Sequence, residues 1–298
     1  MKNIYEQVDA NKRKSFLVIL IFITFITLAS YFLTYSFGLD LSIVGVALVF
    51  SGLLSFLSYY HSDKLVLSIS KASPASKNTH FEFFTVTENL VKVARLPMPR
   101  LYVIEDSAMN AFATGRDPEH AVVVATTGLL KRLNRTELEG VVAHELSHVG
   151  NQDIRLMGIV TVLVGMITLL ADILLRSRFR GSRDRNEQGQ LGLIIFLVGF
   201  LLALLSPLIA NLIKLAVSRR REFLADASAV KLTRYPNGLA SALKKISQDK
   251  EPLEVANKAT AHLYISNPLK NRHDAIGWFA KAFNTHPPVA ERIKALTS

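Results

Sequence analysis

Long uncharged apolar runs alternate with stretches of mixed polarity along this chain of 298 residues. The first two runs extend from about Phe16 to Phe37 and from about Leu41 to Tyr60. A helix of about 20 apolar residues spans a hydrocarbon core of roughly 30 Å. The first run exceeds the roughly 7–15 apolar residues of a signal peptide, and the second follows almost at once, so the pattern predicts two membrane-spanning helices.

Two later apolar runs, 156–175 and 191–210, predict a second membrane hairpin. Asp172 and Pro207 interrupt these runs. The link between them contains Arg176, Arg178, Arg180, Arg183 and Arg185. Either both runs cross the bilayer and place this basic link outside, against the positive-inside tendency, or the hairpin is shallow and re-entrant. The sequence leaves both alternatives open.

A region of mixed polarity separates the two hairpins. Its apolar residues recur first at helical and then at strand spacing, with Pro97 and Pro99 between the two patterns. Thr136 and Glu139 have the spacing of a capping box. The predicted elements are a helix at 81–96, a strand at 100–106, a hairpin formed by 110–115 and 120–127, and a helix from about Thr136.

This pattern divides the chain into four regions. They are an N-terminal segment with the first hairpin (1–63), the first part of a soluble domain (64–155), the second hairpin (156–217) and the second part of the domain (218–298). The last region is mostly helical in pattern, with a final helix from about Pro288. We expect a membrane α-helical protein whose mainly helical α+β domain carries a small β-sheet.

The charge distribution also indicates a membrane protein. The net charge is +11, which is typical of a nucleic-acid binder or of a membrane protein with basic residues beside its spans. Lys12–Lys14 precede the first apolar run and Arg219–Arg221 follow the last, so we expect anionic headgroups rather than nucleic acid as their partners. The link after Phe37 contains Asp40 and no Lys or Arg, which predicts that the N-terminus and the soluble domain are cytoplasmic.

The sequence His144-Glu145-Leu146-Ser147-His148 indicates a zinc site. Positions i and i+4 of a helix lie on one face, so both imidazoles reach one ion. Zinc lowers the pKa of a bound water to about 7, and the neighbouring Glu145 can take its proton. A chance match is the alternative. Because the chain has no cysteine, any further ligand is a histidine or a carboxylate.

Glu222 is the candidate for the third protein ligand that a catalytic zinc site requires. Asp226 lies four residues further on, where it can accept a hydrogen bond from the far nitrogen of a ligand histidine. A solvated helix face is the alternative interpretation. Because a membrane hairpin returns the chain to the side that it left, the two halves of the site are expected to meet.

Four motifs in this order resemble the HtpX-type membrane metalloproteases and, more distantly, the CAAX prenyl endopeptidases. They are NAFATG (110–115), HELSHVGNQD (144–153), REFLADA (221–227) and THPPVAERI (285–293). The resemblance covers nearly the whole chain. It implies a zincin-like domain of the gluzincin type, with one Zn²⁺ bound by His144, His148 and Glu222 and with Glu145 as the base.

The resemblance implies further roles. His286 and Arg292 would approach the active site, where His286 would stabilise the oxyanion. The alternative is a histidine that caps its own helix and an arginine paired on the surface. Asn151 and Asp153 would close the histidine helix. An extended substrate would add as a β-strand to the edge formed by Asn110, Ala111, Phe112 and Ala113.

These observations predict a zinc endopeptidase in the cell membrane. The resemblance implies membrane or misfolded proteins as substrates, cleaved on the cytoplasmic side in quality control and stress response. The bilayer is the other expected partner, and nucleic acid is not. Two alternatives remain open, namely a non-catalytic membrane scaffold with a vestigial metal site and a prenyl-protein processing peptidase.

Overall fold

The computed structural model describes residues 4–37, 40–165, 218–256, 260–268 and 287–298. Most of the second predicted hairpin, together with its arginine-rich link and the candidate residue His286, lies outside the described residues.

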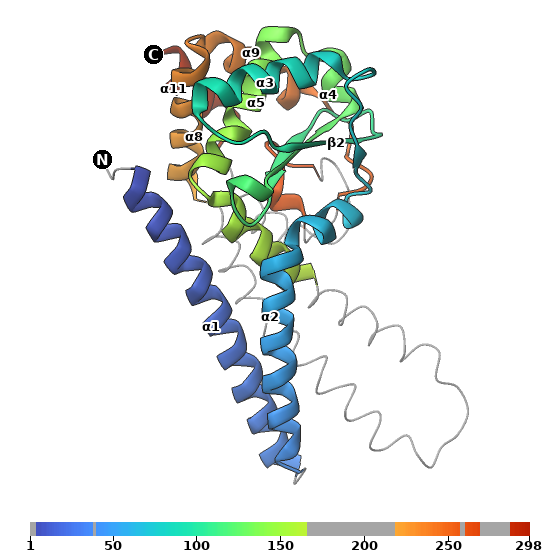
Figure 1. The fold of residues 1–298 in the computed structure, drawn as a ribbon, viewed down its shortest axis with the longest axis vertical. Coiled ribbons are helices and arrows are strands. Elements are labelled where there is room, and N and C mark those ends of the chain that lie inside the picture. The colour runs from blue at the N-terminus through green and yellow to red at the C-terminus, as the bar shows by residue number, and fades with distance from the viewer. Residues whose placement is uncertain (1–3, 38–39, 166–217, 257–259, 269–286) are drawn as a thin grey trace, which may run out of the picture.

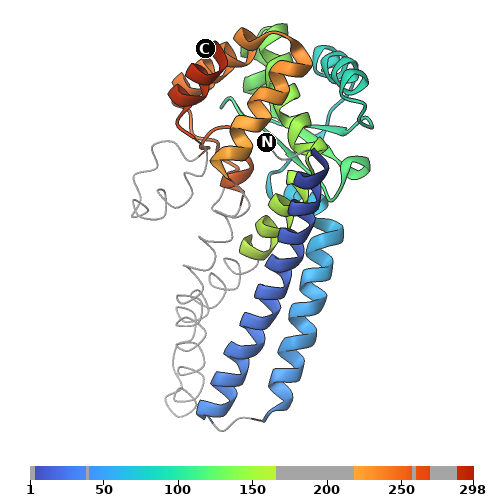
Figure 2. The same cartoon turned by 90° about the vertical axis from the view of Figure 1, so that its left-hand side faces the viewer.

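Helices α1 (Ile4–Phe37) and α2 (Ser42–Ile69) run side by side and project away from the rest of the described chain (Figure 1, Figure 2). Both contain a segment long and apolar enough to cross a membrane, Asp9–Phe32 in α1 and Val44–Ile69 in α2. Many of their large apolar side chains are exposed. Such a surface is costly in water and suits a lipid environment.

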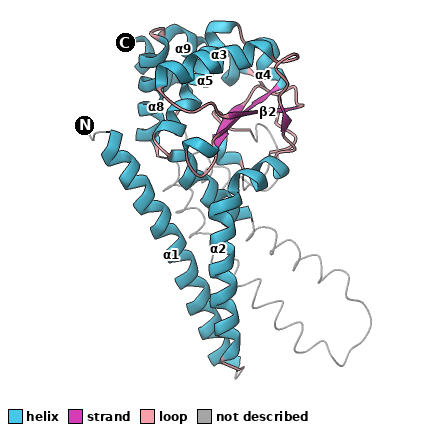
Figure 3. Ribbon diagram, viewed as in Figure 1, coloured by secondary structure: helices cyan, strands magenta, loops and turns pink. Residues whose placement is uncertain are grey.

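The four strands of the described residues form one small mixed sheet among the helices (Figure 3). The strands are β1 (Ser73–Pro74), β2 (Arg100–Ile104), β3 (Ala111–Thr114) and β4 (Val122–Thr126), in the order β1-β2-β4-β3. β3 pairs antiparallel with β4, which confirms the predicted hairpin, and the 3-10 turn η1 (Pro118–His120) lies between them. β4 also pairs parallel with β2, and β1 pairs antiparallel with β2. β3 is therefore an edge strand.

The central strand β4 is buried on both faces, as expected for a strand between two apolar layers. Val122 and Val124 belong to a core shared with α1, α2 and the helical segment 153–165. Val123 and Ala125 point to the opposite face and belong to a second core with the remaining helices. The alternation along one strand thus joins the long apolar helices α1 and α2 to the domain that carries the histidine motif.

Helix α5 lies in the middle of the domain, where it contacts α3, α8, α9 and β3. The described helices of the domain are α3 (Phe81–Ala94), α4 (Thr127–Arg132), α5 (Arg135–Gly150), α8 (Arg219–Thr233), α9 (Pro236–Gln248), the 3-10 turn η2 (Ala261–Leu263) and α11 (Val289–Thr297). The described chain is thus mostly helical with a small mixed sheet, as predicted. Helix α3 and the start of α11 also match their predicted positions.

The predicted capping box of α5 is wrong by two residues. Asn134 is the N-cap, and its side chain accepts a hydrogen bond from the backbone of Glu137, whose carboxylate accepts one from the Asn134 backbone. Thr136 and Glu139 have the same spacing in the sequence but lie inside the helix. The spacing of a capping box fits both Asn134 with Glu137 and Thr136 with Glu139. Contacts with other elements therefore decide which pair caps the helix.

Those contacts come from α9. Ser241 and Lys245 donate hydrogen bonds to the Glu137 carboxylate at 2.6 and 2.7 Å. Burial opposes ionisation of Glu137, but these hydrogen bonds outweigh it and lower its pKa. The helices approach closely nearby, because a Cβ at Gly140 would lie 2.6 Å from the backbone nitrogen of Leu239. The α5–α9 contact thereby fixes where the histidine helix begins.

Candidate functional site

The two histidines of the motif lie on one buried face of α5. His144 is 1% exposed and His148 is 5% exposed, and their Nε2 atoms are 3.3 Å apart. Helix α8, beside α5 in Figure 1, brings Glu222 against them. The two carboxylate oxygens of Glu222 lie 3.6 Å from His144 Nε2 and 3.5 Å from His148 Nε2.

These three side chains have the geometry and chemistry of a metal centre. Each offers one ligand atom, and the three ligand atoms lie within 4.8 Å of one another. Two imidazole nitrogens and one carboxylate oxygen are the donor set of many catalytic zinc sites. All three residues are buried, so a metal ion would compete with few waters for them. The residues present therefore fit a zinc ion.

Both ligand-type histidines are oriented by a carboxylate at the far side of the ring. His144 Nδ1 lies 2.9 Å from Asp226 Oδ1, and His148 Nδ1 lies 3.0 Å from Asp153 Oδ2. A hydrogen bond at Nδ1 leaves the Nε2 lone pair to face a metal. Asp226 was expected here. For Asp153 the expected role was closure of the helix, whereas Asn151 forms the C-cap of α5 and Asp153 contacts His148.

Arg292, on α11, approaches the site and is fully buried. Its Nε and Nη2 atoms donate to the two oxygens of Asp226 at 2.9 and 2.6 Å, and its Nη1 lies 3.7 Å from Glu222 Oε2. The alternative of an arginine paired on the surface is therefore wrong. Arg292 joins the carboxylate that orients His144 to the carboxylate of the third candidate ligand.

The buried charges shift one another's pKa values. Burial and the charge of Arg292 oppose protonation of His144, but hydrogen bonds to Asp226 and Glu222 outweigh them and raise the pKa of His144 to about 9. Burial likewise opposes ionisation of Asp226, yet His144 and Arg292 lower its pKa. The carboxylates thus favour positive charge at the His144 imidazole, and a divalent cation also provides positive charge.

Glu145 lies next to His144 on α5 and is 2% exposed. Adjacent positions of a helix are turned by about 100° from each other, so Glu145 borders the face that carries the two histidines. Its negative charge is one of those that raise the pKa of Arg292 against the effect of burial. A carboxylate at this position is near the site without being one of the three clustered ligands.

The predicted substrate strand is the edge strand β3 together with Asn110. Thr126 N donates to Asn110 O at 3.0 Å, so Asn110 turns its backbone carbonyl to β4 and, by alternation, Ala111 and Ala113 turn theirs away from β4. The residues of β3 are buried in the structure. Ile265 N donates to Ala111 O at 3.0 Å. The edge is thus contacted at Ala111 by a later segment of the chain.

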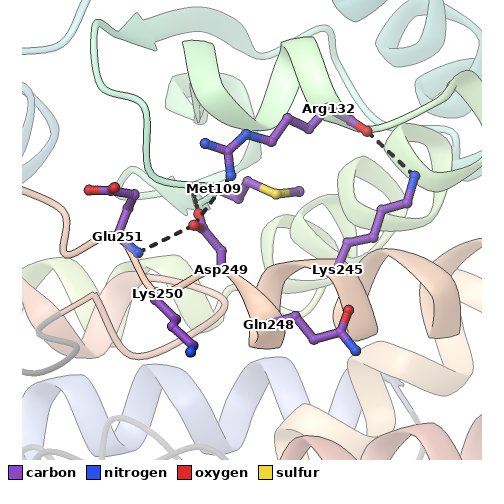
Figure 4. Close-up of a pocket in the computed structure, with 7 residues that line it drawn as sticks. All are labelled: Met109, Arg132, Lys245, Gln248, Asp249, Lys250 and Glu251. Carbon is purple, nitrogen blue, oxygen red and sulfur yellow. Dashed lines mark hydrogen bonds and ion pairs between the residues drawn. The ribbon is translucent and has the colours of Figure 1, made fainter.

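An open pocket of about 500 Å³ lies near the start of β3 (Figure 4). Arg132, which lines it, forms an ion pair with Asp249 at 3.2 Å, and Asp249 also accepts a hydrogen bond from Met109 N at 2.7 Å. Lys245, which also lines the pocket, pairs with Glu137 outside it, and the three clustered ligands do not line it. We therefore place the candidate site at the ligand cluster.

One expected partner is corrected by the structure. Arg221 was expected to contact lipid headgroups with its two neighbours, but its side chain is 12% exposed and lies 3.2 Å from Asp153 Oδ1. Arg219 and Arg220 are exposed. The residue before Glu222 therefore stabilises the carboxylate that orients His148.

Known relatives match this chain along nearly its whole length. Residues 79–298 match the family model Peptidase family M48. The chain is 42% identical to a protease HtpX homolog of Thermoanaerobacter pseudethanolicus over 302 aligned residues, covering 100% of this chain and 98% of the relative. It is 43% identical to a protease HtpX homolog of Dictyoglomus thermophilum, covering 98% of this chain and 93% of that one.

A solved structure shares the fold. The crystal structure of S. mikatae Ste24p superposes with a TM-score of 0.51 at 21% sequence identity, covering 99% of this chain and 67% of that one. This likeness supports the fold alone. The family match and the full-length relatives confirm the resemblance predicted from the four motifs, and the chain therefore belongs to peptidase family M48 as a metalloprotease of the HtpX type.

Proposed function

We propose that the chain is a membrane-anchored zinc endopeptidase in which His144, His148 and Glu222 bind the metal and Glu145 is the catalytic base. One observation carries this proposal, namely the convergence of the three buried ligand atoms within 4.8 Å from helices far apart in the sequence. Membership of a metallopeptidase family favours this proposal over a non-catalytic scaffold. The HtpX-type relatives support the same choice.

Each of the site's side chains has a separate proposed role in peptide hydrolysis. Zinc, when bound, polarises the scissile carbonyl and acidifies a water. Glu145 takes the proton of the attacking water and passes it to the leaving amine. Asp226 and Asp153 hold His144 and His148 in the tautomer that faces the metal. His286 retains its proposed role at the oxyanion, and Arg292 holds Asp226.

The proposed substrates are unfolded or membrane protein segments that add to β3. Pairing through the backbone tolerates many side chains, which suits an enzyme that removes damaged proteins of different sequences. Asn110, Ala111, Phe112 and Ala113 form the proposed binding edge. Ile265 already contacts the carbonyl of Ala111, so the outward backbone groups of Ala113 are the proposed position for the substrate.

We further propose that the N-terminus and the catalytic domain lie in the cytoplasm. Lys12–Lys14 flank the first span, whereas the link on the other side of that span carries Asp40. Asn11, near the N-terminal end of α1, contacts Asp153 beside the histidines, so both belong to the same side of the bilayer. This arrangement supports cleavage at the inner surface.

Cysteine labelling tests the orientation, because the chain contains no native cysteine. Arg13→Cys and Asp40→Cys place thiols at exposed positions near opposite ends of α1. In sealed, right-side-out vesicles, a membrane-impermeant maleimide should label Asp40→Cys directly and Arg13→Cys only after lysis. The unmodified chain is the control and should not react. Equal labelling of both variants before lysis would overturn the proposed topology.

Removal of the metal tests the activity. The detergent-purified protein should contain about one zinc per chain, and a chelator should abolish cleavage of an unfolded protein until zinc is restored. The control is chelator that has been saturated with zinc beforehand. A chain that cleaves equally well without metal, or binds no zinc when zinc is supplied, would contradict the proposal. Cleavage of a prenylated peptide but not of the unfolded protein would favour the prenyl-processing alternative.

A further inference from the structure

Asn11 is buried beside the candidate metal centre, where its side chain contacts residues far away in the sequence. It belongs to the first helix, ahead of the first apolar run, and is 3% exposed. Its side-chain nitrogen donates to Asp153 Oδ1 at 2.8 Å and to the backbone oxygen of Asn151 at 2.9 Å. Its side-chain oxygen accepts from Arg221 Nη1 at 3.4 Å.

These contacts place Asn11 one residue away from a candidate zinc ligand. Asp153 uses one oxygen for Asn11 and the other for His148 Nδ1, at 2.8 and 3.0 Å. Arg221 also donates to Asp153 Oδ1 at 3.2 Å, and it directly precedes Glu222 on α8. One amide therefore contacts the end of the histidine helix, the carboxylate that orients His148, and the start of the helix that bears Glu222.

The chemistry of this position suits an amide. Two acceptors and one cation surround the side chain, and asparagine has two N–H donors and one oxygen acceptor to match them. A leucine has a similar branched shape, although it is larger, and it can form none of these hydrogen bonds. It would leave the Asp153 oxygen and the Asn151 carbonyl without this donor in a buried place.

We propose that Asn11 is a positioning residue of the metal centre, so that the first helix of the chain sets the zinc affinity of the catalytic domain. The inference rests on the proposed zinc site. Asn11 holds the Asp153 carboxylate, and this carboxylate fixes the ring orientation of His148. Removal of a direct partner of a ligand, such as Asp153, changes metal affinity about 10- to 100-fold, and this is the upper limit for a residue that acts through it.

The test compares Asn11→Leu with Ser15→Ala in the full-length protein. Ser15 lies one turn along the same buried side of α1, and its hydroxyl donates only to the helix backbone, at Asn11 O. Zinc affinity is measured without substrate, by competition with a chelator of known affinity. We expect Asn11→Leu to lower it, by no more than the roughly 10- to 100-fold loss caused by Asp153→Asn, and Ser15→Ala to leave it unchanged. Thermal unfolding of both metal-free variants gives the structural baseline.

A double variant distinguishes a role of Asn11 in positioning Asp153 from a role in anchoring helix α1. If Asn11 acts through Asp153, the loss caused by Asp153→Asn should not deepen when Asn11→Leu is added. Should Asn11→Leu fail to fold, Asn11→Ser, which cannot supply both donors, replaces it with the same expected fall. Unchanged zinc affinity with a lowered melting temperature would overturn the inference and make Asn11 a structural anchor. Absence of zinc from the parent protein would instead refute the proposed metal site.

Discussion

Replacement of Glu145 by glutamine is expected to reduce proteolysis about 10²–10⁴-fold while one zinc per chain remains bound. Glutamine keeps the size and most of the polarity of the side chain but cannot accept the proton of the attacking water. The three metal ligands are unchanged, and Glu145 is not among the clustered ligand atoms. The measurement is the initial rate of cleavage of an unfolded protein together with zinc content.

Glu139→Gln is the matched control for this variant. Glu139 lies on the same helix and pairs with Arg135 at 3.3 Å, with a partly exposed side chain. Its substitution should leave both the rate and the zinc content within the range of the parent protein. Loss of zinc from Glu145→Gln would show that Glu145 supports the metal centre instead of the proton transfer. An undiminished rate would remove Glu145 as the base.

Arg292→Met is expected to lower the free energy of unfolding by about 3–5 kcal/mol. The fully buried guanidinium forms two hydrogen bonds with Asp226, at 2.9 and 2.6 Å. Methionine fills part of the space but leaves Asp226 with a buried negative charge that only His144 offsets. A loss of this size corresponds to a melting temperature lower by roughly 10 °C.

Thermal unfolding followed by circular dichroism checks this expectation. Arg135→Met, at the exposed pair with Glu139, should cost no more than about 1 kcal/mol. Adding Asp226→Asn to Arg292→Met should recover part of the loss, because the unpaired charge is removed. If Arg292→Met melts like Arg135→Met, the buried pair contributes nothing to stability and the assignment of Arg292 as the support of Asp226 fails.

Local sequence patterns predicted the helices and strands that surround and carry the site residues. The helical periodicity of α3, the β3–β4 hairpin and the position of the histidine motif on α5 each depend on neighbouring residues, and the structure has them where they were expected. The convergence of Glu222 on the two histidines followed from ligand chemistry, since two histidines are an incomplete zinc site. The roles of these residues in catalysis stay predictions.

Contacts between distant segments were not predictable in the same way. β1 has two residues and leaves no periodic pattern, and the parallel pairing of β2 with β4 joins strands that are not consecutive. The position of the α5 cap depends on α9, and spacing alone chose the wrong pair. Asn11 and Asp153 lie 142 positions apart. Nothing in the local sequence of an asparagine before an apolar run predicts that it contacts the carboxylate that orients His148.

The ribosome synthesises the residues of the site in the order in which they occur along the chain. The histidine pair lies near the middle of the chain, and Arg292 follows 148 positions after His144. At about 5–20 residues per second, that delay lasts roughly 7–30 s. Throughout it, the nascent polypeptide lacks the arginine that secures Asp226, and for much of it Glu222 as well. The proposed zinc-binding set is therefore complete only after Glu222 has been made, and the arginine that holds Asp226 is added later still.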